Sequence, residues 1–124
     1  MSLLLIDKSA YVRGEIAAAD ADELCLCAVT RLELLYSART SADYERIEAD
    51  LAMFRDLRMD FETFATALLA QRVLAARGQH RIPLPDLLIA SCAQQYAADV
   101  VHVDRRYEAL AGVLAFRPRR LDPA

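Results

Sequence analysis

The segment PLPDLLIASCAQQYAADVVHVDRRY, residues 83–107, contains the features that decide the fold. Its run Leu87–Ala93 is apolar on nearly every side, which predicts a buried helix rather than an amphipathic surface helix. Residues 100–103 then have the pattern of a short buried strand, and a helical pattern resumes after them. One carboxylate, Asp86, therefore lies at the start of a core helix, and a second, Asp104, directly follows a core strand.

The rest of the chain alternates short apolar strands with helical segments. Strands are expected at residues 3–6, 24–28, 57–59, 100–103 and 113–116, with Pro118 ending regular structure after the last one. Helices are expected at 9–13 with an extension as far as 19, and at 29–40, 44–54, 61–76, 86–96 and 105–110. This alternation predicts one α/β domain over residues 1–124, a three-layer α/β/α sandwich around a mostly parallel sheet.

Composition sets limits on the function. The 124 residues are 56% hydrophobic and 27% charged, which is typical of a soluble globular domain. The early apolar run Leu3–Ile6 is too short for a signal peptide or a membrane span, so we expect a cytoplasmic protein without a membrane partner. The net charge of −3 argues against a non-specific nucleic-acid coat. Three cysteines are interpreted as small core residues, and two histidines away from ligand spacing disfavour zinc.

Four carboxylates are predicted to converge at one edge of the sheet. Asp7 and Asp104 follow their strands, and parallel strands end at the edge where such sheets bind ligands. Asp86 begins a helix that can face this edge, and Glu33 lies one turn into the helix after the second strand. Acids gathered there repel one another unless a cation lies between them, and an all-oxygen ligand set suits Mg²⁺ or Mn²⁺.

Each acid also has a purely structural interpretation. Asp7, Asp86 and Asp104 precede or open helices, so each can serve as an N-cap. Thr30 and Glu33 match the spacing of a capping box, in which the glutamate reaches back to the threonine backbone. Capping explains each acid singly, but it does not explain why four acids share one edge.

Four segments, in order, carry a resemblance that spans nearly the whole chain. They are Leu-Ile-Asp-Lys-Ser-Ala, Thr-Arg-Leu-Glu-Leu-Leu, Pro-Asp-Leu-Leu-Ile-Ala and Val-Val-His-Val-Asp-Arg-Arg-Tyr. Together they resemble the PIN-domain family, and within it the bacterial VapC-type toxins of type II toxin–antitoxin pairs. The resemblance implies a Mg²⁺- or Mn²⁺-dependent endoribonuclease, a homodimer, and a small VapB-like antitoxin that blocks the site.

The resemblance also implies roles for individual residues. Asp7, Glu33, Asp86 and Asp104 would form the catalytic site, with the three aspartates holding the metal and Glu33 acting on the attacking water. Ser9 matches a small hydroxyl residue that supports the first aspartate. From the residues themselves, we expect Thr30 and His102 to support the acids, and the arginines Arg105 and Arg106 at the rim of the site to hold the RNA backbone.

Two positions depart from the family pattern. His102 replaces a common Ser or Thr, and Arg106 replaces a further acid, which favours one well-held ion over two. A catalytically silent PIN-like module that binds RNA or protein is the alternative function.

Two apolar helical stripes bear on assembly. Tyr44, Ile47, Leu51 and Phe54 form one, and the segment Phe61–Ala76 carries the other. Either they cover the sheet, or part of them forms a homodimer face or a groove for an antitoxin helix.

Overall fold

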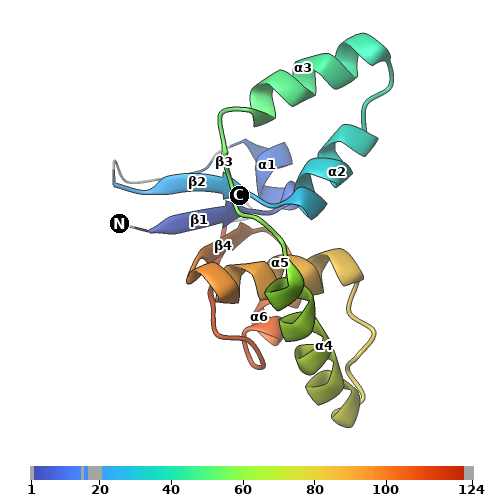
Figure 1. Cartoon of the computed structure of the whole chain (residues 1–124), viewed down its shortest axis with the longest axis vertical. Coiled ribbons are helices and arrows are strands. Elements are labelled where there is room, and N and C mark those ends of the chain that lie inside the picture. Colours follow the sequence, from blue (N-terminus) through green and yellow to red (C-terminus); the bar gives the residue numbers. More distant parts are fainter. Residues whose placement is uncertain (1, 15, 17–20, 122–124) are drawn as a thin grey trace.

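The computed structural model describes residues 2–14, 16 and 21–121, and within them five strands form one parallel sheet (Figure 1). The strands are β1 (Leu3–Ile6), β2 (Glu23–Leu26), β3 (Arg55–Asp56), β4 (Asp99–His102) and β5 (Arg117–Arg120). They are ordered β3-β2-β1-β4-β5, and every neighbouring pair is parallel. The predicted α/β class with a mostly parallel sheet is confirmed.

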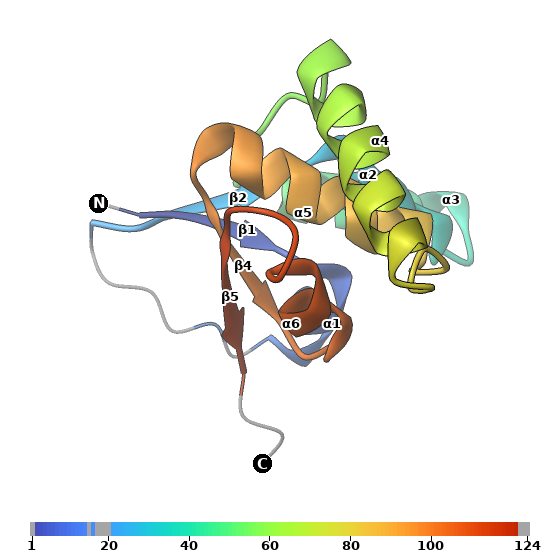
Figure 2. The same cartoon turned by 90° about the horizontal axis from the view of Figure 1, so that it is seen from below.

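Helices cover both faces of the sheet. They are α1 (Lys8–Arg13), α2 (Ala28–Tyr36), α3 (Ser41–Leu51), α4 (Phe61–Ala76), α5 (Leu84–Tyr96) and α6 (Arg106–Leu110). In Figure 1, α1, α2 and α3 lie on one side of the strands and α4, α5 and α6 on the other; Figure 2 shows the same arrangement from below. None of the helices in the described part of the chain is long and apolar enough to cross a membrane.

Strand β1 shows why both sides of the sheet are apolar. Leu4 and Ile6 pack into the cluster beneath α1–α3, while Leu5 points into the cluster beneath α4–α6. All three side chains are fully buried. A parallel sheet covered on both faces requires such continuous apolar strands, so the run LLLI is one of the clearest fold signals in the sequence.

The order of the strands creates a crevice at the end of β1. The chain leaves β1 toward β2, whereas it leaves β4 toward β5 on the opposite side. Neighbouring strands whose connections diverge in this way define a topological switch point, where open α/β sheets bind ligands outside the carboxyl ends of the strands. Asp7 follows β1 and Asp104 follows β4, so both acids lie at the switch point.

Two strands lie elsewhere than predicted. The final strand is Arg117–Arg120 rather than residues 113–116, and Pro118 lies inside it, opposite Val100. Pro118 fits because β5 is an edge strand, where a missing N–H donor can be tolerated. The strand predicted at 57–59 is instead the short β3 at Arg55–Asp56, next to β2.

The bounds of several helices also differ from prediction, and α3 is Ser41–Leu51 rather than residues 44–54. Helix α1 ends at Arg13 because Gly14 adopts a left-handed conformation, with φ of 81°, that favours glycine. Of the predicted extension to residue 19, residues 15 and 17–19 lie outside the described part. Helix α2 begins at Ala28 and ends at Tyr36, a few residues short of the predicted end.

Helix α4 directs most of its large apolar side chains away from the core. Small residues such as Ala67 and Ala70 are buried against the core, together with Leu74. The apolar side chains that are exposed on α4 are Phe61, Phe64, Leu68, Leu69 and Val73. The predicted apolar stripe therefore exists, but it faces outward and offers an interaction surface.

Candidate active site

Asp7 is the most buried acid at the switch point, with 6% of its surface exposed. Its Oδ2 accepts hydrogen bonds from Ser9 N at 3.1 Å and Ser9 Oγ at 2.5 Å, so it is the N-cap of α1. Its Oδ1 accepts a hydrogen bond from the Tyr107 hydroxyl at 2.7 Å. The capping interpretation of Asp7 is therefore correct, but one carboxylate oxygen is also held by a side chain from α6.

Ser9 connects the two strands that border the crevice. Its hydroxyl donates to Asp7 at the end of β1 and accepts a hydrogen bond from Val103 N, 3.0 Å away, just after β4. The predicted supporting role of Ser9 thus corresponds to a contact with Asp7 and with the segment that carries Asp104.

His102 and Asp104 form a compact unit at the end of β4. His102 is fully buried, and its Nδ1 accepts a hydrogen bond from Asp104 N at 3.1 Å. Burial lowers the pKa of His102, which favours the neutral ring. Because Nδ1 accepts the hydrogen bond from Asp104 N, the proton of the neutral ring belongs on Nε2. Because this bond fixes the backbone of Asp104, His102 is a positioning residue for the acid rather than a ligand.

Tyr107 is a site residue that no sequence motif singled out. It is fully buried, its ring centroid lies 4.9 Å from that of His102, and its hydroxyl reaches Asp7. Burial and then the charge of Asp7 raise the pKa of Tyr107 far above its usual value, so the phenol remains a donor. The sequence feature that could have identified Tyr107 is its position three residues after Asp104, near the start of the helix that follows β4.

Asp86 lies in the first turn of α5 but does not cap it. Pro83 occupies the N-cap position and makes no side-chain capping bond, so the N-cap interpretation of Asp86 is wrong. Burial, followed by the charges of Asp7 and Asp104, raises the pKa of Asp86 to about 6. The mutual influence of these charges places the three aspartates in one electrostatic cluster.

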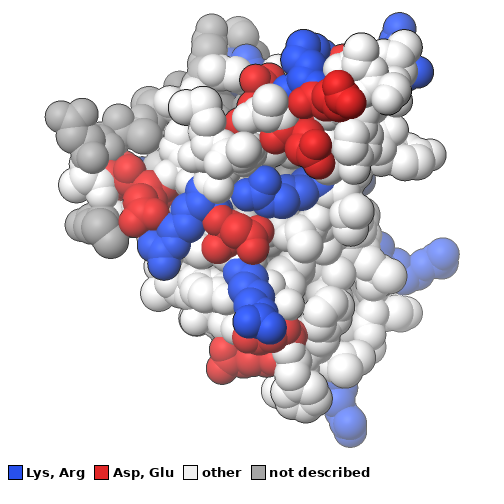
Figure 3. All heavy atoms as spheres, turned by 45° about the horizontal axis from the view of Figure 1, so that its top comes forward, with Lys and Arg blue, Asp and Glu red and all other residues white. Residues whose placement is uncertain are grey.

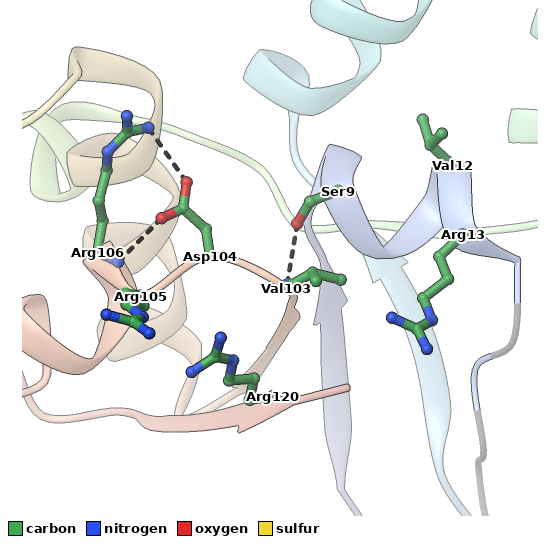
Figure 4. Close-up of a pocket in the computed structure, with 8 residues that line it drawn as sticks. All are labelled: Ser9, Val12, Arg13, Val103, Asp104, Arg105, Arg106 and Arg120. Atoms are coloured by element: carbon green, nitrogen blue, oxygen red, sulfur yellow. Dashed lines mark hydrogen bonds and ion pairs between the residues drawn. The ribbon is translucent and has the colours of Figure 1, made fainter. Parts of the chain in front are cut away.

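Arg106 links two members of this cluster. Its Nη1 lies 3.1 Å from Asp104 Oδ2 and 3.5 Å from Asp86 Oδ2, and its backbone N donates to Asp104 Oδ1 at 3.0 Å. Figure 4 shows the guanidinium folded back over the Asp104 carboxylate. The residue expected to hold RNA from the rim therefore makes its ion pairs with the acids.

Glu33, in α2, interacts electrostatically with Asp7. Partial burial and the charge of Asp7 raise its pKa, and the nearby Lys8 opposes this effect. The predicted capping box is wrong, because α2 begins at Ala28, so Thr30 lies within the helix. Thr30 is fully buried, and its Oγ1 lies 3.7 Å from Cys27 Sγ, which places it in the core beneath the helix.

The acids of the site have the donor chemistry of a divalent-ion site but not its spacing. Among the described residues, no three His, Cys, Asp or Glu side chains are gathered closely enough to form a metal site as they stand. The chemistry of the donors nevertheless fits Mg²⁺ or Mn²⁺, since all are carboxylate oxygens. A cation, the guanidinium of Arg106, already lies between Asp86 and Asp104.

Arg105 lies outside this network. It is exposed and lines a groove beside Asp104 together with Arg106 and two further arginines, Arg13 and Arg120. Over the face shown in Figure 3, acidic and basic side chains are interspersed rather than separated into single-sign surfaces. The groove beside Asp104 is therefore a local concentration of arginine on an acidic protein.

Comparison with known proteins shows which family this chain belongs to. The PIN domain family matches residues 4–113, and the chain belongs to this family. Ribonuclease VapC17 of Mycobacterium tuberculosis (strain CDC 1551 / Oshkosh) is 40% identical over 120 residues, which cover 91% of this chain and 90% of the relative. Ribonuclease VapC18 of Mycobacterium tuberculosis (strain ATCC 25618 / H37Rv) is 36% identical over 104 residues, covering 82% and 76%.

Solved structures agree with the fold. The structure of VapBC-1 from nontypeable Haemophilus influenzae superposes with a TM-score of 0.79 at 15% identity, covering 95% of this chain and 97% of that one. The structure of VapBC-5 from Mycobacterium tuberculosis, a member of the VapBC family of toxin–antitoxin systems, has a TM-score of 0.71 at 24% identity. It covers 98% of this chain and 100% of that one. At these identities the likeness establishes the shared fold.

Proposed function

We propose that the protein is a metal-dependent endoribonuclease, the toxin of a type II toxin–antitoxin pair. The observation that carries the proposal is the cluster of Asp7, Asp86 and Asp104 at the switch point, within a chain 40% identical to a ribonuclease. Capping does not account for Asp86, because this residue makes no capping bond, and burial and the charges of Asp7 and Asp104 disfavour its ionised form.

The aspartates would hold Mg²⁺ or Mn²⁺, and a bound ion of this kind polarises a phosphate oxygen and lowers the pKa of water. Asp7 is prepared for this role because Ser9 and Tyr107 fix both of its oxygens before any ligand arrives. His102 fixes the backbone of Asp104 in the same way. Glu33 has a raised pKa, which suits a group that accepts a proton from the attacking water.

Arg106 would change its partners when an ion enters. Its guanidinium competes for the same oxygens of Asp86 and Asp104, so it must withdraw from them. A withdrawn Arg106 could then pair with a phosphate oxygen of the RNA, since guanidinium binds phosphate and carboxylate by the same fork. This exchange reconciles the proposed RNA-binding role with the observed ion pairs.

We further propose a homodimer and a small VapB-like antitoxin as partners. The exposed apolar face of α4 supports a protein interface, and a groove of about 270 Å³ between α4 and α5 is lined by Phe64, Leu68 and Leu84. A second groove, of about 390 Å³, joins the exposed Leu32 and Tyr36 to Glu33 and Lys8. An antitoxin segment lying there would cover one side of the acidic cluster.

Incubation of the protein with a pool of structured and unstructured RNAs tests the function. We expect endonucleolytic products with Mg²⁺ or Mn²⁺ and none with EDTA, while circular dichroism shows the same fold in both. The matched control is Asp86→Asn, which keeps the shape of the side chain and removes its charge. RNA binding without cleavage under every metal condition would favour the catalytically silent module instead.

A further inference from the structure

A groove lies next to Asp104 and Arg106, at the border of the aspartate cluster. It has a volume of about 810 Å³, and Ser9, Val12 and Val103 line it together with four arginines: Arg13, Arg105, Arg106 and Arg120. Figure 4 shows Arg13 on one side of Val103 and Arg105 and Arg120 on the other. Asp104 is the only acid that lines this groove in the described part of the chain.

Three separate elements bring these arginines together. Arg13 is the last residue of α1, and Arg105 lies in the turn between β4 and α6. Arg120 is the last residue of β5 and is paired in register with His102, so it lies at the carboxyl end of the sheet. The sequence of β5, RPRR, is unusually polar for a strand of an α/β sheet, and it places the guanidinium of Arg120 in the groove beside Asp104.

The charge in the groove is available to a ligand at two positions. On the same strand, Arg117 and Arg119 are each paired with Asp99, at 2.9 Å and 2.6 Å. In contrast, Arg105 and Arg120 are exposed and have no ion pair with any carboxylate among the residues described. Asp99 thus neutralises the first two arginines of β5, whereas Arg120, at the groove, has no such partner in the described part of the chain.

We propose that this groove binds the phosphodiester backbone of a single-stranded RNA that flanks the scissile phosphate, with Arg105 and Arg120 as its phosphate contacts. The assignment rests on the proposed function, because it places the flanking strand beside Asp104. Guanidinium groups bind phosphate through paired N–H donors. The exposed Val12 and the half-buried Val103 offer apolar contact to sugars and bases between the phosphates.

The measurement is fluorescence anisotropy of a labelled 12-nucleotide single-stranded RNA with the full chain in EDTA, where no cleavage is expected. The double variant Arg105→Ala/Arg120→Ala should bind at least tenfold more weakly than wild type at low salt. The slope of log K against log salt concentration should fall by about 1.4, since each lost phosphate contact on a single strand removes about 0.7.

Two single variants serve as matched controls. Arg72→Ala removes an exposed arginine from α4, away from the groove, and should leave both affinity and slope unchanged. Arg117→Ala removes an arginine from the same strand as Arg120 and should have a smaller effect than Arg120→Ala. Thermal unfolding of all variants identifies any that lose the fold, and the single variants Arg105→Ala and Arg120→Ala then replace the double one.

The possible results distinguish failure of the groove proposal from failure of the nuclease proposal. Equal RNA binding by wild type and the groove variants, or no binding by wild type, overturns the groove assignment whether or not the protein cleaves RNA. Weakened binding by the groove variants supports it even if wild type cleaves nothing, in which case only the nuclease proposal fails. An acidic dodecapeptide that competes as strongly as RNA would instead assign the groove to a carboxylate-rich protein segment and overturn the RNA proposal.

Discussion

The hydroxyl of Tyr107 donates a 2.7 Å hydrogen bond to Oδ1 of Asp7, joining two residues that are 100 positions apart in the sequence. Both side chains are buried, and Ser9 holds the other oxygen of the same carboxylate. The bond therefore ties α6 to the end of β1 and fixes the carboxylate in one orientation. A ligand site on Asp7 is thus built into the folded chain before any ligand binds.

The first prediction concerns this bond. Tyr107→Phe keeps the ring against His102 and removes only the donor to Asp7. Because hydrogen bonds to charged groups contribute about 1.5–3 kcal/mol, we expect the free energy of unfolding to fall by about that amount in urea titrations. Tyr36→Phe is the matched control, since Tyr36 is 90% exposed. Unchanged stability of Tyr107→Phe would mean that the bond contributes nothing net to the fold.

The second prediction uses the pH dependence of Asp86. Its folded-state pKa of about 6 lies above the unfolded value of about 3.9. Between about pH 3.9 and about pH 6, folding is therefore accompanied by uptake of a proton on Asp86. As the pH rises through this window, the free energy of unfolding decreases, and above about pH 6 the full destabilisation by the charged Asp86 is present. Asp86→Asn should stabilise the metal-free protein at about pH 7.5, and this gain should disappear below about pH 4. Urea titrations at both pH values, with EDTA present, measure the difference. An equal effect at both would contradict the shifted pKa.

The third prediction concerns competition between Arg106 and a metal ion. Arg106→Gln removes the guanidinium from Asp86 and Asp104 but keeps the backbone N–H that donates to Asp104. We expect Mn²⁺ to bind several-fold more tightly to this variant, as measured by calorimetry, because the ion no longer displaces a positive charge. Arg105→Gln is the neighbouring control and should behave like wild type. Weaker Mn²⁺ binding to Arg106→Gln would show that the guanidinium does not compete for the site.

The fourth prediction concerns the outward face of α4. Leu68 is 68% exposed and lines the groove between α4 and α5. If this face forms the proposed homodimer, light scattering at micromolar concentration should give a dimer for wild type and a monomer for Leu68→Lys. Met53→Lys, which also replaces an exposed apolar residue but follows α3, should remain a dimer. A strictly monomeric wild type would count against the dimer.

Part of the fold followed directly from sequence patterns. The strand Leu3–Ile6 and the helix Phe61–Ala76 were predicted with the observed bounds, because continuous apolar runs and helical periodicity are local signals. The same signals missed β5, since RPRR has no apolar pattern and is a strand only through its pairing with β4. Periodicity also did not show that the large side chains of α4 face outward, because a core stripe and an interface stripe have the same spacing.

The part of the candidate site that lies directly after the strands could be predicted from the sequence. Asp7 and Asp104 follow β1 and β4, so sheet topology alone brings them to one edge. The ion pairs of Arg106 and the bond from Tyr107 were not predictable, because they depend on how α6 packs against the end of the sheet. The capping box at Thr30 failed for a local reason, since α2 begins before it.

In the proposed mechanism, the acidic cluster cleaves RNA through a bound divalent ion. The most direct measurement is single-turnover cleavage of one RNA substrate as a function of Mn²⁺ concentration, for wild type and Asp7→Asn. We predict a saturable rise in rate for wild type, no cleavage in EDTA, and a rate for Asp7→Asn that is lower by orders of magnitude at every Mn²⁺ concentration. Cleavage by wild type at the full rate in EDTA, or by Asp7→Asn at the wild-type rate, would contradict the account.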